Sequence, residues 1–330
     1  MRIRHHSFTL LLLLWTAINA YAINPSLLPD PNDLIEGDAA DLYEDAQALL
    51  VKQDIYKQLD QWGGMEPKEL PRAQVRRVLK KCQPVLDTLD QAALCKTCLW
   101  PSSEMDWTDI RYCARLLSIR ASLAIVERKP EEALQAMRTS LTLARHSAEA
   151  EGLIPSMIGI AITGLTCRNI PAYIELDDAP NLYAALAALP DPFIDINQKC
   201  QAEIDALDTN PQVNDENRAQ IEEQLKISHA RVKTLMKRIQ RDMAALQCLV
   251  AIRGYAQKHD NTLPTSLDQI KLTIPEDVYN GQPFVYSCTD NKAVLSSPAP
   301  EGEKPKTALR YEIKTSPQKS RNWFKVKVIN

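Results

Sequence analysis

Residues 110–150 read IRYCARLLSIRASLAIVERKPEEALQAMRTSLTLARHSAEA, and this stretch decides the fold because it predicts two long helices joined by a tight turn. Apolar residues recur with helical spacing in both halves and give each predicted helix a broad apolar face. Between the helices, Lys129-Pro130-Glu131-Glu132 predicts the turn, since proline fits the first position of a helix and acids fit the positive end of its dipole. Consecutive amphipathic helices with short connections pack as a bundle or solenoid.

The sequence before this hairpin predicts two further helices. Asp38 can cap a helix that runs from about 39 to 59 and is ended by Gly63-Gly64. A second helix is expected from about 72 to 94, disturbed at Pro84 because proline cannot donate a backbone hydrogen bond. The segment 23–37 holds three prolines and predicts an extended lead-in.

The sequence after the hairpin predicts that 158–165 begins another helix, which we expect to be buried because it carries little charge. A further short helix is expected at 181–189 and a boundary at Asn210-Pro211. Asn214 or Asp215 can cap a long helix that ends near His259. Its apolar residues form a narrow stripe, as in a helix that is packed on one side and wet on the other. We interpret the five bases in its middle as a solvated face rather than a basic binding surface. These are Arg231, Lys233, Lys237, Arg238 and Arg241.

Four strands are predicted at the C-terminal end, at 284–288, 293–296, 309–314 and 323–328. Thr289-Asp-Asn-Lys292 and the segment from Pro317 to Arg321 are plausible hairpin turns. The predicted fold class is therefore mainly α. A helical-repeat or bundle region occupies 23–195, and a long helix with a small antiparallel sheet occupies 196–330 as an α+β unit.

Residues 1–22 have the pattern of a secretory signal peptide. Arg2 and Arg4 give a positive start, an apolar run follows, and Ala20-Tyr21-Ala22 is a small-x-small cleavage site, so the mature chain is expected to begin near Ile23. The apolar run is shorter than the ~20 residues that a spanning helix needs. We therefore expect an exported protein, periplasmic or extracellular, with no integral membrane segment after cleavage.

Composition narrows the function classes. The formal net charge is −3, and cleavage would remove two arginines, so overall charge gives no case for nucleic acid or an anionic membrane as partner. Only 9 glycines stand against 21 prolines, which disfavours a phosphate-binding loop. Phosphate-loop, dinucleotide and nucleophile-elbow motifs are absent from the sequence, so no catalytic, cofactor-binding or metal-binding residues are predicted.

The eight cysteines form an even set, which in an exported protein predicts disulfides. We expect Cys248 to pair with Cys288 and Cys167 with Cys200, because each set lies inside one predicted unit. Cys82, Cys95, Cys98 and Cys113 would then pair among themselves. Two alternatives remain open: a redox pair at Cys95 and Cys98, and a zinc site made by these four N-terminal thiols.

Three histidines would remain after cleavage, and two tryptophans lie in a predicted loop. His146 and His229 are interpreted as helix-surface residues, and His259 as a helix C-terminal residue favoured by the dipole. Trp100 and Trp107, in a predicted loop, would form either a recognition patch or packing contacts, and packing is favoured.

The predicted hairpin at 110–150 resembles a tetratricopeptide (TPR) repeat. Ala133, Met137 and Ser140 occupy positions where that repeat takes small, large and small residues, while Ala121 and Ala124 stand at its aromatic and glycine positions. The resemblance covers about one repeat and implies a helical surface that binds proteins.

Residues 249–286 resemble the soluble head of a type II secretion pseudopilin. The likeness rests on Tyr255 near the helix end, on Leu263-Pro264-Thr-Ser-Leu267, and on Gly281-Gln-Pro-Phe-Val-Tyr286. It implies a long helix followed by a sheet. The chain departs from that family because it has no prepilin peptidase site and no uninterrupted apolar N-terminal helix.

The whole chain also resembles a group of exported bacterial proteins with no assigned activity. They combine an opening like Asp38-Ala-Ala-Asp-Leu-Tyr43, a helical middle and a pseudopilin-like tail. The leading expectation is a non-enzymatic exported scaffold that presents its helices to a protein partner. The alternative is a component associated with a type II secretion or pilus-like assembly, and the third is a thiol–disulfide or zinc-binding protein through Cys95 and Cys98.

Overall fold

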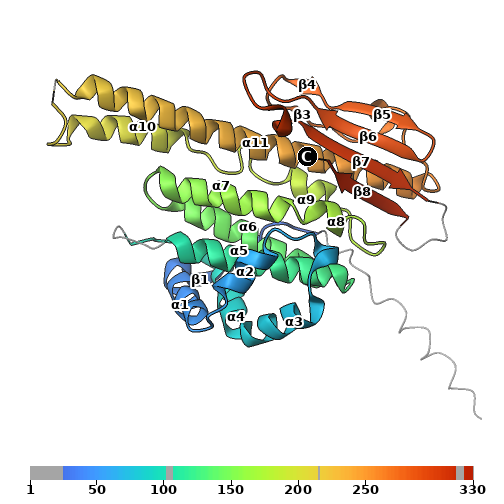
Figure 1. Ribbon diagram of the computed structural model, residues 1–330, viewed down its shortest axis with the longest axis horizontal. Helices are drawn as coiled ribbons and strands as arrows, with labels where there is room; N and C mark the ends of the chain where they lie inside the picture. The colour runs from blue at the N-terminus through green and yellow to red at the C-terminus, as the bar shows by residue number, and fades with distance from the viewer. Residues whose placement is uncertain (1–24, 102–106, 215, 317–322, 330) are drawn as a thin grey trace, which may run out of the picture.

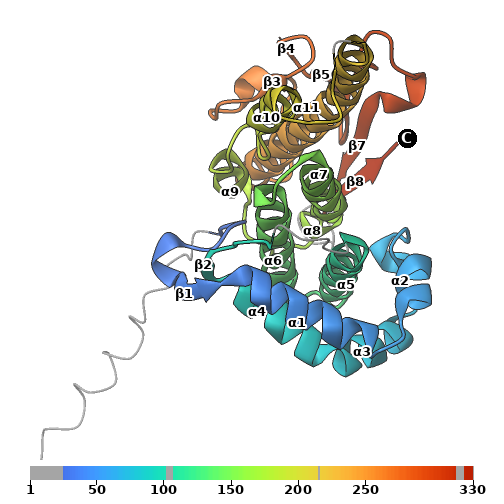
Figure 2. The ribbon, with the colours of Figure 1, turned by 90° about the vertical axis from the view of Figure 1, so that its left-hand side faces the viewer.

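The computed structural model describes residues 25–101, 107–214, 216–316 and 323–329. The protein is mainly helical with small antiparallel sheets at the C-terminal end, as predicted. Figures 1 and 2 show layers stacked on one another: α1 to α4, then α5 and α6, then α7, and finally α11 with the C-terminal sheet.

The helices and strands have the following bounds. The α-helices are α1 (Ala39–Val51), α2 (Tyr56–Trp62), α3 (Arg72–Lys81), α4 (Gln83–Ala92), α5 (Trp107–Val126), α6 (Pro130–Glu149), α7 (Leu153–Cys167), α8 (Ile170–Tyr173), α9 (Tyr183–Ala187), α10 (Asn197–Asp205) and α11 (Arg218–Lys258). The strands are β1 (Ile35–Asp38), β2 (Cys95–Thr97), β3 (Glu276–Asp277), β4 (Gln282–Pro283), β5 (Val285–Thr289), β6 (Lys292–Ser297), β7 (Leu309–Thr315) and β8 (Phe324–Val328).

The first helix is shorter than predicted. Asp38 caps α1 as expected, since its side chain accepts a hydrogen bond from Ala40 N. The prediction of a single helix to residue 59 was wrong, because Asp54 has φ 52°, in the left-handed region that an α-helix cannot continue through. The expected disturbance at Pro84 is confirmed: α3 ends before Cys82, and Pro84 lies in the first turn of α4.

Several short elements were not predicted, among them α8, β3 and β4. A short parallel pair joins β1 to β2, with Ile35 opposite Cys95 and Asp38 opposite Thr97. Strands of three or four residues are too short to show an alternating pattern. Helix α10 was also missed, and α7 begins at Leu153, before the predicted start at residue 158.

The α5–α6 hairpin forms as predicted, and α7 packs against α6 as a third helix. At Gly159 the two backbones approach so closely that a Cβ atom would lie 2.4 Å from Ala144 O and 2.8 Å from Ile194 Cδ1. Helix α9 lies within the predicted 181–189.

Asn210-Pro211 lies in the turn between α10 and α11, so at the expected boundary the chain folds back as a helical hairpin. The Asn214 side chain accepts hydrogen bonds from the backbone N–H groups of Glu216 and Asn217, just before α11, whereas Asp215 lies outside the described residues. In Figure 1 this hairpin projects from the body. We call α10 together with the N-terminal half of α11, residues 218–240, the arm.

The four predicted C-terminal strands are confirmed, each to within about one residue at either end, and pair antiparallel in the order β5-β6-β7-β8. The hairpin at Thr289–Lys292 is confirmed, and the one expected at Pro317–Arg321 lies outside the described residues. The inner face of the sheet is buried (Leu295 and Ile313 both 0% exposed) and covers the C-terminal half of α11. One hydrophobic core runs from α1 to this sheet, across residue 195.

Candidate functional site

The solvent-facing side of α7 is apolar. Its residues follow helical spacing, and Ile154 is 65% and Met157 39% exposed. Ala161 is exposed as well, whereas Ile158 and Leu165 are half-buried. We call these five residues the α7 stripe. A helix that packs on a body normally turns charged residues to water, and α7 has none between residues 153 and 167.

The stretch Leu153–Tyr173 is long and apolar enough to cross a membrane, and it is the one such helix within the described ranges. Of an apolar 18-residue window in this stretch, 61% is buried inside the protein, as in the core helix of a globular domain. The α7 stripe supplies the exposed apolar residues of this stretch, Ile154, Met157 and Ala161.

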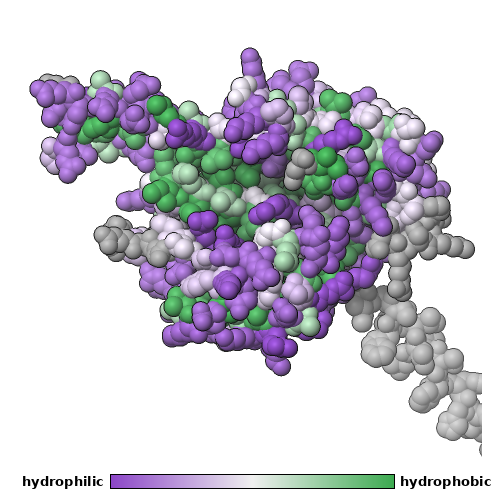
Figure 3. All heavy atoms as spheres, viewed as in Figure 1, coloured by the Kyte–Doolittle hydropathy of each residue, from purple (hydrophilic) through white to green (hydrophobic). Residues whose placement is uncertain are grey.

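The stripe belongs to a larger apolar surface. Figure 3 shows hydrophobic residues gathered over α7 and continuing along the neighbouring side of α11 toward the arm. There α11 contributes half-buried Leu235 and Ile239, and Gly164 lets Ile239 approach α7, since a Cβ at Gly164 would lie 3.1 Å from Ile239 Cδ1. A contiguous apolar surface of this kind marks an interaction site more often than scattered apolar residues do. Exposed Glu151 precedes the stripe and exposed Arg168 follows it.

Polar contacts hold the arm to the body and its two helices together. At its base Lys199 Nζ donates hydrogen bonds to the carbonyl oxygens of Ala148 and Ala150. Further out, His229 Nε2 lies 2.9 Å from Glu203 Oε2, and Arg218 pairs with Asp208 at the tip, at 2.7 Å. The prediction that His229 lies on the helix surface was wrong: it is 6% exposed, because the unpredicted α10 covers it.

The basic middle of α11 divides into two groups. Arg231, Lys233 and Lys237 are exposed, as expected for a solvated face. Arg238 instead pairs with Glu303 at 2.6 Å, and Arg241 is only 4% exposed and donates a hydrogen bond to Thr307 O. The solvated-face interpretation was wrong for these last two, because the loop after β6 folds over them.

His146 is also buried rather than on a helix surface, so that prediction was wrong. Tyr43 reaches it from α1 with Oη 2.9 Å from His146 Nδ1, and Trp100 Nε1 donates to His146 O at 2.6 Å. Burial, followed by the charge of Arg145, lowers the pKa of His146 to about 4. Trp100 stacks on Tyr43 at 5.5 Å and Trp107 meets Trp100 edge-on, so both tryptophans pack as favoured.

Cys95 and Cys98 do not have the geometry of a redox pair. Cys95 lies in β2, and three steps along an extended strand separate Cα atoms by about 10 Å, well beyond disulfide reach. Burial raises the pKa of both thiols, and for Cys98 the nearby Glu149 and Asp38 raise it further. A redox-active thiol needs the opposite shift. Across the described residues no three His, Cys, Asp or Glu side chains gather as metal ligands.

The predicted disulfide pairs are not joined in the structure, where all eight cysteines are free thiols and none lies at disulfide distance from another. Burial raises the pKa of Cys167 to about 12, with Asp242 as a further cause, whereas Cys200 lies on the arm beside Lys233. Cys248 is buried under Pro275, and Cys288 is half-buried in β5. The pairing remains a prediction.

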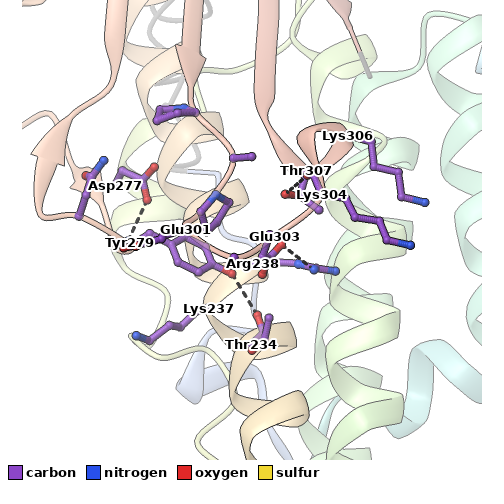
Figure 4. Close-up of a pocket in the computed structure, with 15 residues that line it drawn as sticks. Thr234, Lys237, Arg238, Asp277, Tyr279, Glu301, Glu303, Lys304, Lys306 and Thr307 are labelled. Carbon is purple, nitrogen blue, oxygen red and sulfur yellow. Dashed lines mark hydrogen bonds and ion pairs between the residues drawn. The ribbon is translucent and has the colours of Figure 1, made fainter.

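An open pocket of about 910 Å³ lies between α11, the β3–β4 turn and the loop 298–307 (Figure 4). Several of its polar side chains are engaged: Tyr279 Oη donates to Thr234 O at 3.2 Å, and buried Asp277 accepts from Ser297 Oγ. In Figure 4 the side chains of Lys304 and Lys306 point away from Tyr279. Ser297, whose hydroxyl bonds Asp277, is itself buried and does not line the pocket.

His259 is the C-terminal cap of α11, as predicted, and stacks on Tyr255 at 3.8 Å between ring centroids. Its Nδ1 lies 2.7 Å from Tyr255 O. Within the described residues, the ring nitrogens of His146, His229 and His259 contact a tyrosine hydroxyl, a glutamate carboxylate and a backbone carbonyl. None of these contacts joins a histidine to a serine or cysteine side chain, as a catalytic pair would. Comparison with protein-family models, curated proteins and solved structures finds no match.

Proposed function

We propose that this chain is a non-enzymatic exported protein that binds an apolar helix of a partner protein along the α7 stripe. The observation that carries the proposal is the exposure of Ile154 and Met157 on an uncharged helical face. Spacing of three and four residues along one face matches helix-in-groove recognition. Export is supported by the leader-like residues 1–22.

The arrangement of α5, α6 and α7 supports a TPR-like scaffold. The three helices follow one another in antiparallel order, and Ala133, Met137 and Ser140 are buried in their contacts, with exposures of 0, 0 and 1%. Helical repeats of this kind use one face for packing and offer another to proteins.

The charges at the two ends of the stripe favour one orientation of the partner helix. Exposed Glu151 stands before the stripe and exposed Arg168 after it. A partner helix with a basic residue near Glu151 and an acidic residue near Arg168 would be complementary, and such charges act mainly on specificity and association rate.

The experiment is co-purification of a tagged mature chain from the envelope of exporting cells. The double variant Ile154→Glu, Met157→Glu should lose the partner, because it places two charges on the docking face. Val51→Glu is the matched control, since Val51 is 51% exposed at the end of α1, away from the stripe. If the natural chain, the double variant and Val51→Glu all recover the partner equally, the α7 stripe is rejected as the binding site.

A component associated with a type II secretion or pilus-like assembly is the second candidate. Its support is the layout of α11, whose C-terminal half carries the four-stranded sheet while its other half projects as the arm, as a pseudopilin head sits on its helix. Ile227, 39% exposed on the arm, is the residue to change. Ile227→Glu should abolish association with the apparatus, and unchanged association would reject this candidate.

A further inference from the structure

The two edge strands of the C-terminal sheet, β5 and β8, differ in how far their outer sides are protected. At one edge β8 has the sequence FKVKV, with exposed Lys325 and Lys327, and α8 lies against it. Glu175 Oε1 also accepts the outward N–H of Val326 at 2.8 Å. Charged side chains and covering elements are the usual protection of an edge strand against pairing with another chain.

The other edge, β5, lacks this protection. Its sequence VYSCT contains no charge, proline or glycine, and Val285 is 60% exposed. Figure 1 shows β5 as an edge strand of the four-stranded sheet, and no backbone hydrogen bond within the described chain reaches its outer side.

The register with β6 fixes which backbone groups point outward. Thr289 and Lys292 close the tight hairpin and therefore bond to each other, so Ser287 and Val285 also face β6. The N–H and C=O groups of Tyr286 and Cys288 alternate with these and point away from the sheet.

We propose that β5 pairs antiparallel with β5 of a second copy of this chain, about a two-fold axis through Ser287, and so joins two four-stranded sheets into one. With Ser287 on the axis, each Tyr286 faces Cys288 of the other copy, and the outward groups of both residues form four hydrogen bonds. Val285 then faces Thr289. No like charges oppose each other, which is what a self-pairing strand requires.

A second copy fits this edge better than an unrelated extended peptide because the strand is its own complement over all five residues. The contact is small compared with the ~1,600 Å² that standard protein–protein interfaces bury. The dimer should therefore be weak, with a dissociation constant in the micromolar range, on the order of 10 μM. This inference does not depend on the α7 stripe.

Sedimentation of the mature chain over about two decades of concentration is the first test, since dimerisation follows mass action. The natural chain and Val328→Lys should dimerise alike, because Val328 is exposed on the opposite edge strand. Ser287→Lys places two lysines face to face and should raise the dissociation constant by about tenfold or more. A chain that stays monomeric throughout, or a Ser287→Lys variant that dimerises like the natural chain, overturns the proposal.

Cross-linking tests the register. In Ser287→Cys the two new thiols would face each other across the axis, at the ~4.5 Å Cα separation of a non-hydrogen-bonded pair, and oxidation should give a disulfide-linked dimer. Thr289→Cys is the matched control, because its thiol would face Val285 of the other copy. Both side chains point to solvent, so neither change disturbs the core. A dimer linked through Thr289→Cys and not through Ser287→Cys overturns the proposed axis.

Discussion

Glu175 Oε1 accepts a 2.8 Å hydrogen bond from the backbone N–H of Val326, and this bond ties the helical part of the protein to the edge of its sheet. Burial raises the pKa of Glu175, and the Val326 N–H partly opposes that shift. Holding a carboxylate at this position carries a desolvation cost, which the hydrogen bond reduces.

Replacing Glu175 by Ala should lower the free energy of unfolding by about 1–2 kcal/mol, since it leaves the Val326 N–H without its acceptor. Glu175→Gln keeps an acceptor oxygen and should lose less. Urea unfolding measures both, and hydrogen exchange at Val326 should speed up only in the alanine variant. Equal stability of the natural chain and Glu175→Ala would show that the bond does not hold β8.

Gly159→Ala should destabilise the protein by about 1–3 kcal/mol, because the new methyl group would meet Ala144 O at 2.4 Å and force α6 and α7 apart. Gly64→Ala is the control, since a Cβ there meets nothing within 4 Å. The two thermal midpoints should differ clearly, and similar midpoints would contradict the close helix approach.

Tyr43→Phe should cost about 1–3 kcal/mol, because it leaves the buried Nδ1 of His146 without a partner. Tyr183→Phe is the comparison: its hydroxyl donates to Thr273 O at an exposed site, where water can replace it. The measurement is chemical unfolding of both variants. If Tyr43→Phe loses no more stability than Tyr183→Phe, the hydrogen bond between Tyr43 and His146 does not contribute as described.

Asp242 gives the protein a pH-dependent stability. Burial raises its pKa from 3.8 to about 6, with Arg241 and Arg238 opposing, so the folded state prefers the neutral acid. The contribution of Asp242 to the free energy of unfolding is fully present below its ordinary pKa of 3.8, and it is lost as the pH rises from about 4 to 6. His146, with its pKa lowered to about 4, acts in the opposite sense, since its contribution rises with pH up to about 6.5.

Asp242→Asn should therefore be more stable than the natural chain at pH 7, by roughly 2 kcal/mol. It should also keep the stability that the natural chain loses between pH 4 and 6, because the amide does not ionise. Denaturant midpoints at a series of pH values test this. Asp45→Asn, at an exposed position of α1, should leave the profile unchanged. If the stability of Asp242→Asn depends on pH in the same way as that of the natural chain, ionisation of Asp242 is not the cause of the loss.

The thiols provide the last prediction. In the reduced folded protein a thiol reagent should label Cys288 first, because the other seven cysteines are buried. Intact mass after labelling gives the number of adducts, and peptide mass mapping gives their positions. The same measurement on oxidised, denatured protein tests the predicted pairs Cys248–Cys288 and Cys167–Cys200. Early labelling of Cys98 would contradict the burial described above.

The sequence predicted those parts of the fold that carry long periodic patterns. The hairpin at 110–150, the helix that ends at His259 and the four C-terminal strands all extend over enough residues for periodicity to be visible. The break at Asp54 could not be predicted, because a left-handed aspartate carries no proline or glycine signal.

Burial of the site residues was harder to predict because it depends on distant segments. His146 is covered by Tyr43, more than one hundred residues earlier in the chain, and His229 by α10, a helix with little apolar periodicity. In the sequence the α7 stripe is only part of a stretch with little charge, and this pattern predicts a buried helix. Which side of α7 stays exposed to solvent depends on where α11 and the arm pack, and the local sequence does not show this.

The contact between Tyr43 and His146 has a consequence for how the chain comes together. A polypeptide emerges from a ribosome or a translocation channel with its N-terminal end first, so α1 appears long before α6. Arg138 Nε also donates to Ser26 O, across a similar span. Helix α4 packs against α1 early, but the part of α1 around Tyr43 must wait until more than one hundred further residues have followed before His146 reaches it. An escort that shields this part of α1 during that interval would serve this protein better than rapid local folding alone.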